Sequence, residues 1–176
     1  MKKPILLFAL YFITSFTIIQ AQQNIHQEKS VIEFHITGGG IFKVKGTFTG
    51  MQGDFHLDTS DLKNANFNIC VDASSINTKN QKRDDHLRSA DFLDTKTHKN
   101  ICFVSSAVTK TENGFKTIGN MTIHGVTQFV EIPFTYTNNT FIGDLVINRF
   151  DYNIGEDFST IRVGKEARVT ITCVVY

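Results

Sequence analysis

The chain has 176 residues, and its 18 Lys and Arg residues are nearly balanced by 17 Asp and Glu residues. No part of the sequence gathers the basic residues into a stripe, so the charge pattern argues against nucleic-acid binding. A chain of this length can bury the core of one domain, and we find no repeat, linker or low-complexity tract that would divide it.

Residues 1–21 have the features of a secretory signal peptide. Two lysines precede an apolar run from Ile5 to Ile19, and the small residue Ala21 follows at a suitable cleavage point. A transmembrane anchor is the alternative, but the run is shorter than the roughly 20 residues that a membrane-spanning helix needs. We therefore expect a mature domain of residues 22–176 that is periplasmic or secreted.

Apolar and polar residues alternate with period two from residue 31 to the C-terminus, a pattern typical of half-buried strands. The alternating runs lie near residues 32–36, 42–48, 55–57, 67–71, 101–103, 121–123, 130–136, 141–147 and 169–175. Turn residues separate them, including Gly50–Gly53 and Asn138-Asn139. We interpret the runs as about eight strands in an all-β, closed antiparallel barrel, with a β-sandwich as the competing architecture.

One apolar face of these strands would point into the barrel. The residues predicted to line the interior are Phe34, Ile36, Phe42, Val44, Phe67, Ile69, Phe103, Met121, Ile123, Ile132, Phe134, Phe141 and Leu145. An eight-stranded barrel can fill its interior with side chains or hold one small ligand, and composition alone does not separate the two.

The segment from Arg83 to Asp94 is a dense cluster of charged and apolar residues, and residues 81–92 are the only good helix candidate. We expect it to cap one barrel mouth, with Leu87 and Phe92 facing inward. The predicted cap residues are Arg83, Asp84, His86, Leu87, Arg88, Asp91 and Phe92. Its arginines would fasten the cap to neighbouring carboxylates or, alternatively, hold a polar or phosphorylated ligand head.

No motif for catalysis or metal binding stands out, so we predict no catalytic residue and no metal site. The serines lack the context of a nucleophile elbow. No two histidines have the i,i+4 spacing of a helical zinc site, and the six are His26, His35, His56, His86, His98 and His124.

The three cysteines, Cys70, Cys102 and Cys173, are far apart in the sequence and form no CxxC motif. Cys173 lies on the apolar face of its strand, which is typical of a buried small hydrophobe. A Cys70–Cys102 disulfide is compatible with an oxidising compartment, and the sequence leaves the question open.

Three segments in this order, residues 72–78, 83–94 and 101–106, resemble the YceI-like family of lipocalin-type barrels. Weaker similarity covers residues 30–36, 44–53, 119–130 and 149–155. The resemblance implies an elongated eight-stranded barrel with a capping helix and a long apolar tunnel. The tunnel would hold an isoprenoid chain, such as a polyprenyl phosphate or a ubiquinone-like lipid, and the family implies no enzymatic activity. Leu93 and the tight connection at Asn138-Asn139 depart from the family pattern, which affects the expected length of the ligand.

We therefore expect a binding protein that carries, stores or scavenges a long-chain apolar lipid, with no cofactor other than that lipid. Transient membrane contact would accompany such a role, and nucleic acid is not an expected partner. The alternative is a filled barrel that acts as a non-enzymatic interaction or stress-adaptation module.

The first prediction concerns the N-terminus. Because residues 1–21 resemble a cleavable signal, the exported protein should be soluble and begin near Gln22. N-terminal sequencing of protein from a cell fractionation measures this directly. Residues 1–21 retained in a membrane fraction would contradict it.

Overall fold

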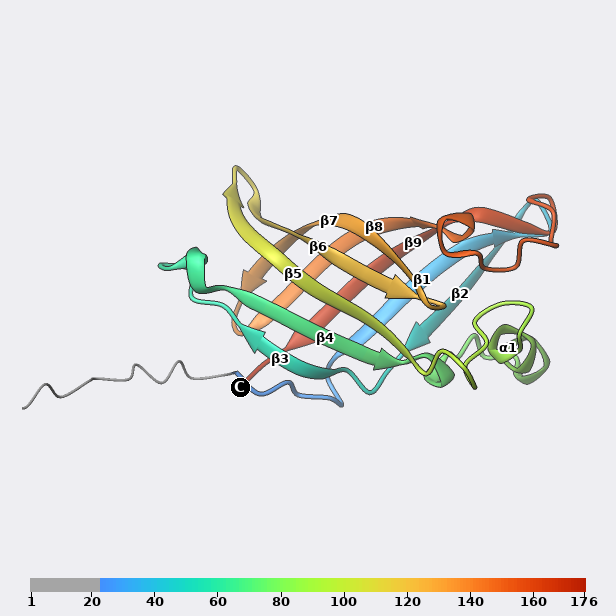
Figure 1. Ribbon diagram of the computed structural model, residues 1–176, viewed down its shortest axis with the longest axis horizontal. Helices are drawn as coiled ribbons and strands as arrows, with labels where there is room; N and C mark the ends of the chain where they lie inside the picture. The colour runs from blue at the N-terminus through green and yellow to red at the C-terminus, as the bar shows by residue number, and fades with distance from the viewer. Residues whose placement is uncertain (1–22) are drawn as a thin grey trace, which may run out of the picture.

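The structure, a computed structural model, describes residues 23–176 and consists mainly of one curled antiparallel sheet (Figure 1). Its nine strands are β1 (Val31–Gly38), β2 (Phe42–Phe48), β3 (Gln52–His56), β4 (Asn66–Asp72), β5 (Asn100–Thr111), β6 (Gly114–Ile123), β7 (Val126–Thr137), β8 (Thr140–Asn148) and β9 (Val163–Val174). One α-helix, α1 (Gln81–Arg88), and the 3-10 turns η1 (Leu62–Asn64), η2 (Ala73–Ser75) and η3 (Arg149–Tyr152) complete the described chain.

The sheet order is β2-β1-β9-β8-β7-β6-β5-β4-β3, so the strand count is nine and not the predicted eight. The difference arises at residues 49–51. Up to this point the chain forms β2 and pairs with β1. It then continues in the same direction, and this second part forms β3, which pairs with β4 (Figure 1). The predicted turn at Gly50–Gly53 is therefore a kink between two parts of one extended run. Together β2 and β3 occupy the eighth position of the barrel.

The outer edges of β2 and β3 are partly covered by other segments. Asn77 exchanges two backbone hydrogen bonds with Thr47 of β2, each 3.0 Å long. On the other side, the backbone N–H of Gln23 donates to the carbonyl of Phe55 in β3, and its side-chain oxygen accepts from the N–H of Leu57. These bonds satisfy backbone groups that a free sheet edge would expose.

The end of the barrel away from α1 is packed with aromatic rings. The ring centroids of Phe134 and Phe141 are 4.4 Å apart, and those of Phe55 and Phe67 are 4.8 Å apart. Phe67 also meets Phe141 edge to face. Such offset and edge-to-face pairs are favourable arrangements for aromatic side chains. This half of the interior is a filled core.

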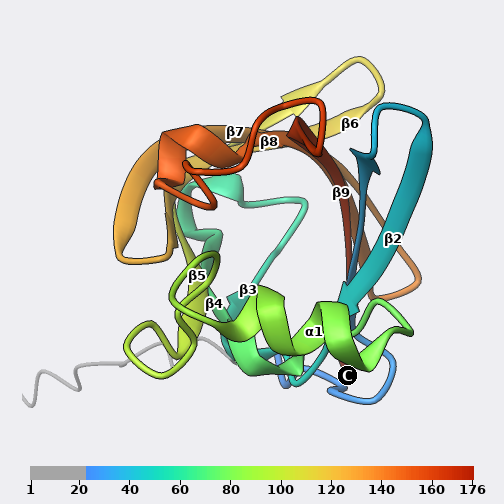
Figure 2. The same cartoon turned by 90° about the vertical axis from the view of Figure 1, so that its right-hand side faces the viewer.

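The view down the barrel shows what surrounds the other end (Figure 2). Helix α1 lies along one side of the opening, and the segment from η3 to the start of β9 lies along the opposite side. Within residues 23–176, no helix is both long and apolar enough to cross a membrane. The predicted signal peptide, residues 1–21, lies outside the described residues.

Cys70 and Cys102 form a disulfide, which answers the question that the sequence left open. They are direct cross-strand partners in β4 and β5, with Cα atoms 4.1 Å apart. The bond closes the loop that contains η2 and α1. Cys173 is buried with a free thiol, and burial raises its pKa to about 12, so it remains protonated at neutral pH.

The second prediction concerns this disulfide. Its cysteines are separated by 32 positions, so loop-closure entropy gives a stabilisation of about 3–4 kcal/mol. The Cys70→Ser/Cys102→Ser variant should therefore unfold at a lower denaturant concentration than the oxidised wild type. Reductant should lower the wild-type midpoint and leave that of the variant unchanged. A wild-type midpoint insensitive to full reduction would argue against a stabilising bond.

Candidate binding cavity

A cavity of about 450 Å³ opens at the α1 end of the barrel. Its walls come from β1, β2, β8 and β9, from single residues of β5 and β6, from the α1 segment and from the segment between η3 and β9. The apolar lining consists of Ile32, Phe34, Ile36, Val44, Phe48, Ile76, Leu87, Phe92, Leu93, Ile101, Ile123, Ile147, Ile154, Phe158, Val163, Ala167 and Val169. We call this space the mouth cavity.

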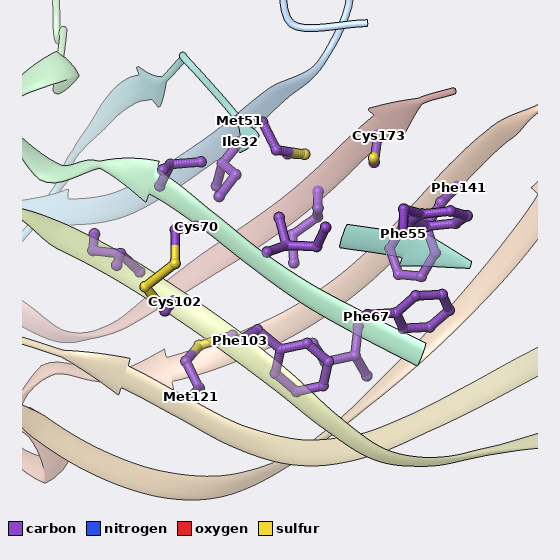
Figure 3. Close-up of a pocket in the computed structure, with 15 residues that line it drawn as sticks. Ile32, Met51, Phe55, Phe67, Cys70, Cys102, Phe103, Met121, Phe141 and Cys173 are labelled. Atoms are coloured by element: carbon purple, nitrogen blue, oxygen red, sulfur yellow. A yellow bond between two sulfur atoms is a disulfide. The ribbon is translucent and has the colours of Figure 1, made fainter. Parts of the chain in front are cut away.

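A second space of about 60 Å³ lies deeper in the barrel (Figure 3). Its lining includes Met51, Phe103 and Met121, together with the rings of Phe67 and Phe141 at the edge of the packed core. Ile32 and Ile101 line both spaces, so they mark the boundary between them. The interior is thus one open mouth cavity, a small inner space and a filled end, and not one long tunnel.

The structure distributes the predicted lining residues over these regions. Phe34, Ile36, Val44 and Ile123 line the mouth cavity, whereas Phe67, Ile69, Phe103, Met121, Ile132 and Phe141 line the inner space. Phe134 and Leu145 line neither: Phe134 is buried in the core, and Leu145 packs against it while partly buried.

The prediction for Phe42 is wrong. Phe42 shares the alternation of Val44, but it is the first residue of β2, next to the turn that joins β1 to β2. No element of the barrel covers this position, and Phe42 is 69% exposed.

A glycine in β2 shapes the wall of the mouth cavity. Gly46 pairs with Phe34 across β1 and β2, and a Cβ atom at Gly46 would clash with the Phe34 ring. The missing side chain lets that ring lie over β2. The β1–β2 register is continuous at Gly46, so the glycine causes no bulge.

Helix α1 covers part of the opening and is shorter than the predicted helix of residues 81–92. It begins after Asn80, whose side chain accepts a hydrogen bond from the N–H of Arg83. It ends at Arg88, and the following Ser89 directs both its N–H and its hydroxyl to the carbonyl of His86. Leu87 lines the mouth cavity, as does Phe92 beyond the end of the helix.

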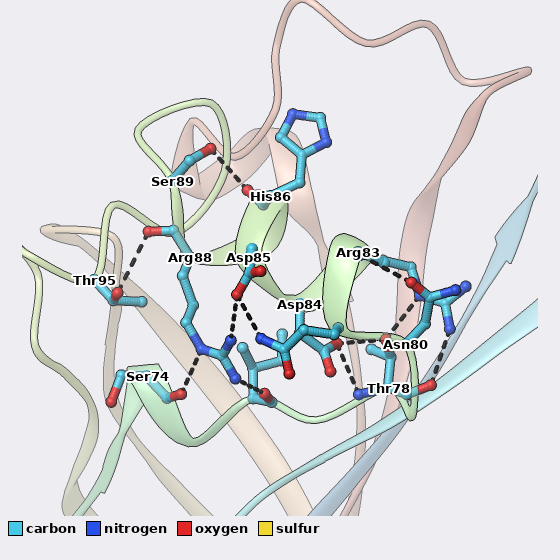
Figure 4. A network of polar contacts seen from close by, with 12 residues as sticks. Ser74, Thr78, Asn80, Arg83, Asp84, Asp85, His86, Arg88, Ser89 and Thr95 are labelled. Carbon is cyan, nitrogen blue, oxygen red and sulfur yellow. Dashed lines mark hydrogen bonds and ion pairs between the residues drawn. The ribbon is translucent and has the colours of Figure 1, made fainter.

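The carboxylate of Asp84 lies at the centre of the polar contacts under α1 (Figure 4). Asp84 is only 5% exposed and accepts hydrogen bonds from the backbone N–H and the hydroxyl of Thr78. Arg83 donates to the hydroxyl and the carbonyl of the same threonine. Burial alone would raise the pKa of Asp84, but the Thr78 hydrogen bonds and the charges of Arg88 and Arg83 hold it below its ordinary value.

Arg88 connects α1 to the chain that precedes it. Its guanidinium donates to the carbonyl oxygens of Ser74 at 2.7 Å and Ile76 at 2.6 Å, and it also pairs with Asp85 (Figure 4). This geometry matches the fastening role considered above, although two of its three partners are carbonyls and not carboxylates. Two further predicted cap residues, His86 and Asp91, form a solvent-exposed contact of 3.0 Å.

Arg149, which the sequence did not single out as a site residue, organises the opposite side of the opening. It is 4% exposed, and its five N–H groups donate to carbonyl oxygens of Ile154, Gly155, Phe158, Val163 and Gly164. The irregular segment between η3 and β9 is thereby folded against the mouth. The ring of Phe158 then meets that of Phe92 at 4.7 Å and joins the two sides.

The charged residues that line the mouth cavity are all basic or histidine: Arg83, His86, Arg149 and Arg162. No Asp or Glu of the described chain lines it. Arg149 is fully hydrogen-bonded, whereas the Arg162 side chain has no hydrogen bond or ion pair with residues 23–176. The cavity is therefore apolar inside and positively charged at its opening. In the same part of the chain, no group of three His, Cys, Asp or Glu residues could hold a metal ion.

A curled antiparallel barrel with a short capping helix and an apolar cavity beneath it has the geometry to hold one small ligand. The chain belongs to the YceI-like domain family, whose model matches residues 23–175. That match confirms the family resemblance of the sequence, and with it the all-β fold.

Curated relatives match over part of their length. A UPF0312 protein of Serratia proteamaculans is 35% identical over 105 residues, which cover 60% of this chain and 55% of the relative. Protein YceI of Escherichia coli is 31% identical over 136 residues, which cover 75% of this chain and 71% of that protein. This chain spans about half the length of several of the curated relatives that it matches.

Solved structures share the fold. BcnA of Burkholderia cenocepacia has a TM-score of 0.77 and 24% identity, over 85% of this chain and 98% of that one. A YCEI protein of Campylobacter jejuni has a TM-score of 0.68 and 24% identity, over 77% and 86% of the two chains. A polyisoprenoid binding domain from Saccharophagus degradans, implicated in plant cell wall breakdown, has a TM-score of 0.65 and 14% identity, over 86% and 95%.

The third prediction concerns Asp84. Since its pKa is lowered in the folded state, its charge stabilises the fold above the ordinary pKa of 3.8, and this contribution is lost as the pH falls through the lowered value. Asp84→Asn should cost about 1 kcal/mol near pH 7, because hydrogen bonds to a charged acceptor are the stronger ones. The cost should shrink in acid.

Denaturant unfolding of wild type and Asp84→Asn over a pH series measures this effect. Asp85→Asn is the matched control, because Asp85 is the next residue of α1 and its side chain is 63% exposed. An Asp84→Asn cost that is the same at every pH would contradict the role of the charge.

Proposed function

We propose that this protein is a non-enzymatic carrier that holds an isoprenoid-type lipid, a polyprenyl phosphate or a quinone-like molecule, in the mouth cavity. The observation that carries the proposal is the mouth cavity itself, with its apolar walls and charged opening. The YceI-like family and the polyisoprenoid-binding domain among the structural neighbours support the choice of lipid class.

The size and chemistry of the cavity suit such a ligand. Its volume of about 450 Å³ lies within the range of roughly 300–1,000 Å³ typical of small-molecule pockets. Each methylene group moved from water into an apolar site contributes about 0.8 kcal/mol, so a few isoprene units give useful affinity without polar contacts. Specificity then comes from the length of the cavity and the groups at its opening.

The filled end of the barrel limits the length of the chain that can be enclosed. Ile32 and Ile101 stand between the mouth cavity and the inner space, and the rings of Phe67 and Phe141 follow beyond. A bound chain would place its apolar end toward these residues and its polar end near Arg83 and Arg162. A long polyprenyl chain would extend partly outside the barrel.

The proposal includes the compartment. A carrier of membrane lipids in the periplasm or outside the cell fits the predicted signal peptide of residues 1–21, and the Cys70–Cys102 disulfide fits an oxidising environment. Fractionation and N-terminal sequencing test this part independently of the ligand.

A filled barrel that acts as an interaction or stress-adaptation module is the second candidate. It is favoured by the packed aromatic rings of Phe55, Phe67, Phe134 and Phe141, which occupy the end of the interior away from α1. Native mass spectrometry of protein purified without detergent separates the candidates, because a carrier retains a mass that lipid extraction removes.

The fourth prediction tests the mouth cavity with a residue that fills it. Ala167 lines the cavity from β9, so Ala167→Phe should occupy space that the lipid would use. Displacing about two methylene groups lowers affinity roughly tenfold, and the lipid-bound fraction in native mass spectra should fall accordingly. Val146→Phe is the matched control, because Val146 is in the neighbouring strand β8 and is 50% exposed.

Thermal melts of delipidated protein show that each variant is folded. Equal lipid retention by Ala167→Phe and Val146→Phe, with both proteins folded, would place the ligand outside the mouth cavity and overturn the proposal.

A further inference from the structure

A second hollow lies beside the mouth cavity, along β1 and β2 and the segment of residues 77–83. It has a volume of about 680 Å³, and we call it the basic groove. Five cationic residues line it, Lys43, Lys45, Lys79, Arg83 and Arg168, whereas Glu33 is the only acidic residue in its lining. Arg83 lines the mouth cavity as well, so the two hollows meet at this side chain.

The sheet register concentrates this charge. His35 in β1 is the direct cross-strand neighbour of Lys45 in β2 and of Arg168 in β9. Lys45 and Arg168 therefore lie on the same face of the sheet, one strand apart, and their like charges repel each other. None of the five groove cations belongs to an ion pair between residues 23 and 176. The groove therefore carries an excess of positive charge, with five cations against the single carboxylate of Glu33.

Large apolar side chains are exposed next to the groove and the mouth. Ile41 and Phe42, at the β1–β2 turn, are 79% and 69% exposed, and Ile161, before β9, is 76% exposed. The N–H of Gly39 donates to the carbonyl of Arg162 at 2.9 Å, which holds these two tips together. Phe42 also lines the basic groove. The tips stand at the α1 end of the barrel (Figures 1 and 2).

We propose that this end of the barrel docks on the surface of an anionic phospholipid bilayer. Ile41, Phe42 and Ile161 enter the interfacial region, while the cations of the basic groove face the lipid head groups. Apolar side chains flanked by Lys and Arg are the usual composition of a membrane-surface contact. Docking in this orientation brings the mouth cavity against the bilayer. The proposal extends the proposed function, since a lipid carrier must exchange its cargo with a membrane.

The charge distribution explains why docking would have one orientation. Lys2 and Lys3 are the only charged residues before residue 23, so the formal charge of +1 for the whole chain becomes −1 without them. The barrel as a whole is thus not attracted to an anionic surface, and the basic groove is a local exception. Glu156 and Asp157, in the segment before Ile161, line neither the groove nor the mouth cavity.

Co-sedimentation with lipid vesicles tests the docking surface. We expect delipidated protein to bind vesicles of phosphatidylcholine with added phosphatidylglycerol, and to bind pure phosphatidylcholine vesicles much less. Added salt should weaken the binding, because it screens exposed charges. Lys43→Gln/Lys45→Gln should lower the partition coefficient about tenfold or more. Ile41→Ser/Phe42→Ser should lower it in low and in high salt.

Lys63→Gln/Lys110→Gln is the matched control, because it removes the same charge at the other end of the barrel, in η1 and near the end of β5. Equal binding by this control and by Lys43→Gln/Lys45→Gln would overturn the proposal. The proposal would also be overturned if the wild type did not bind anionic vesicles. The same holds if Ile41→Ser/Phe42→Ser abolished self-association in solution and left vesicle binding unchanged.

Native mass spectra of the same variants separate this proposal from the proposed function. Lys43 and Lys45 do not line the mouth cavity, so their replacement should leave lipid retention unchanged. Vesicle binding by a wild type that carries no lipid would support docking and contradict the carrier function. Lipid retention without vesicle binding would support the carrier function and contradict docking.

Discussion

The carboxylate of Asp84 is buried beneath α1 and accepts two hydrogen bonds from Thr78, while Arg83 and Arg88 donate to carbonyl oxygens of Ser74, Ile76 and Thr78. All of these bonds join the helix to the chain just before it, and none crosses the barrel. The polar contacts that hold α1 thus leave the interior free, and the Phe92–Phe158 ring contact joins the cap to the opposite side of the opening. Leu87 and Phe92 contribute to the wall, and the space beneath remains open.

The two ends of the barrel use different chemistry. The end away from α1 is stabilised by stacked and edge-to-face phenylalanine rings, which leave no room for a ligand. The α1 end is held by arginine hydrogen bonds to backbone carbonyls, and every arginine of the chain lines the mouth cavity, lines the basic groove or fastens the cap. A guanidinium can bond several carbonyls at once, as Arg149 does, so an irregular segment can be ordered without an apolar core.

Period-two alternation identified the strand runs because it reports directly which residues face a core. It could not show that residues 42–56 change partner from β1 to β4, since a kink leaves the alternation intact on either side. It also placed Phe42 inside, because alternation gives the face of a strand and not the point where the barrel ends. The disulfide depends on the register of β4 against β5, which no local pattern contains. The role of Arg149 depends on carbonyls up to 15 positions away in the sequence, and only the folded segment brings them together.

The cap segment has a simple relation to the sheet: it leaves β4 and returns in β5, two strands that are hydrogen-bonded neighbours and covalently joined at its base. A segment inserted between adjacent strands can be exchanged or redesigned without disturbing the pairing among the nine strands, provided that the bridge from Asn77 to Thr47 at the edge of β2 is kept. The barrel and its cap are therefore separable units of variation. A common scaffold can acquire an opening of a different shape by changes confined to the residues between β4 and β5.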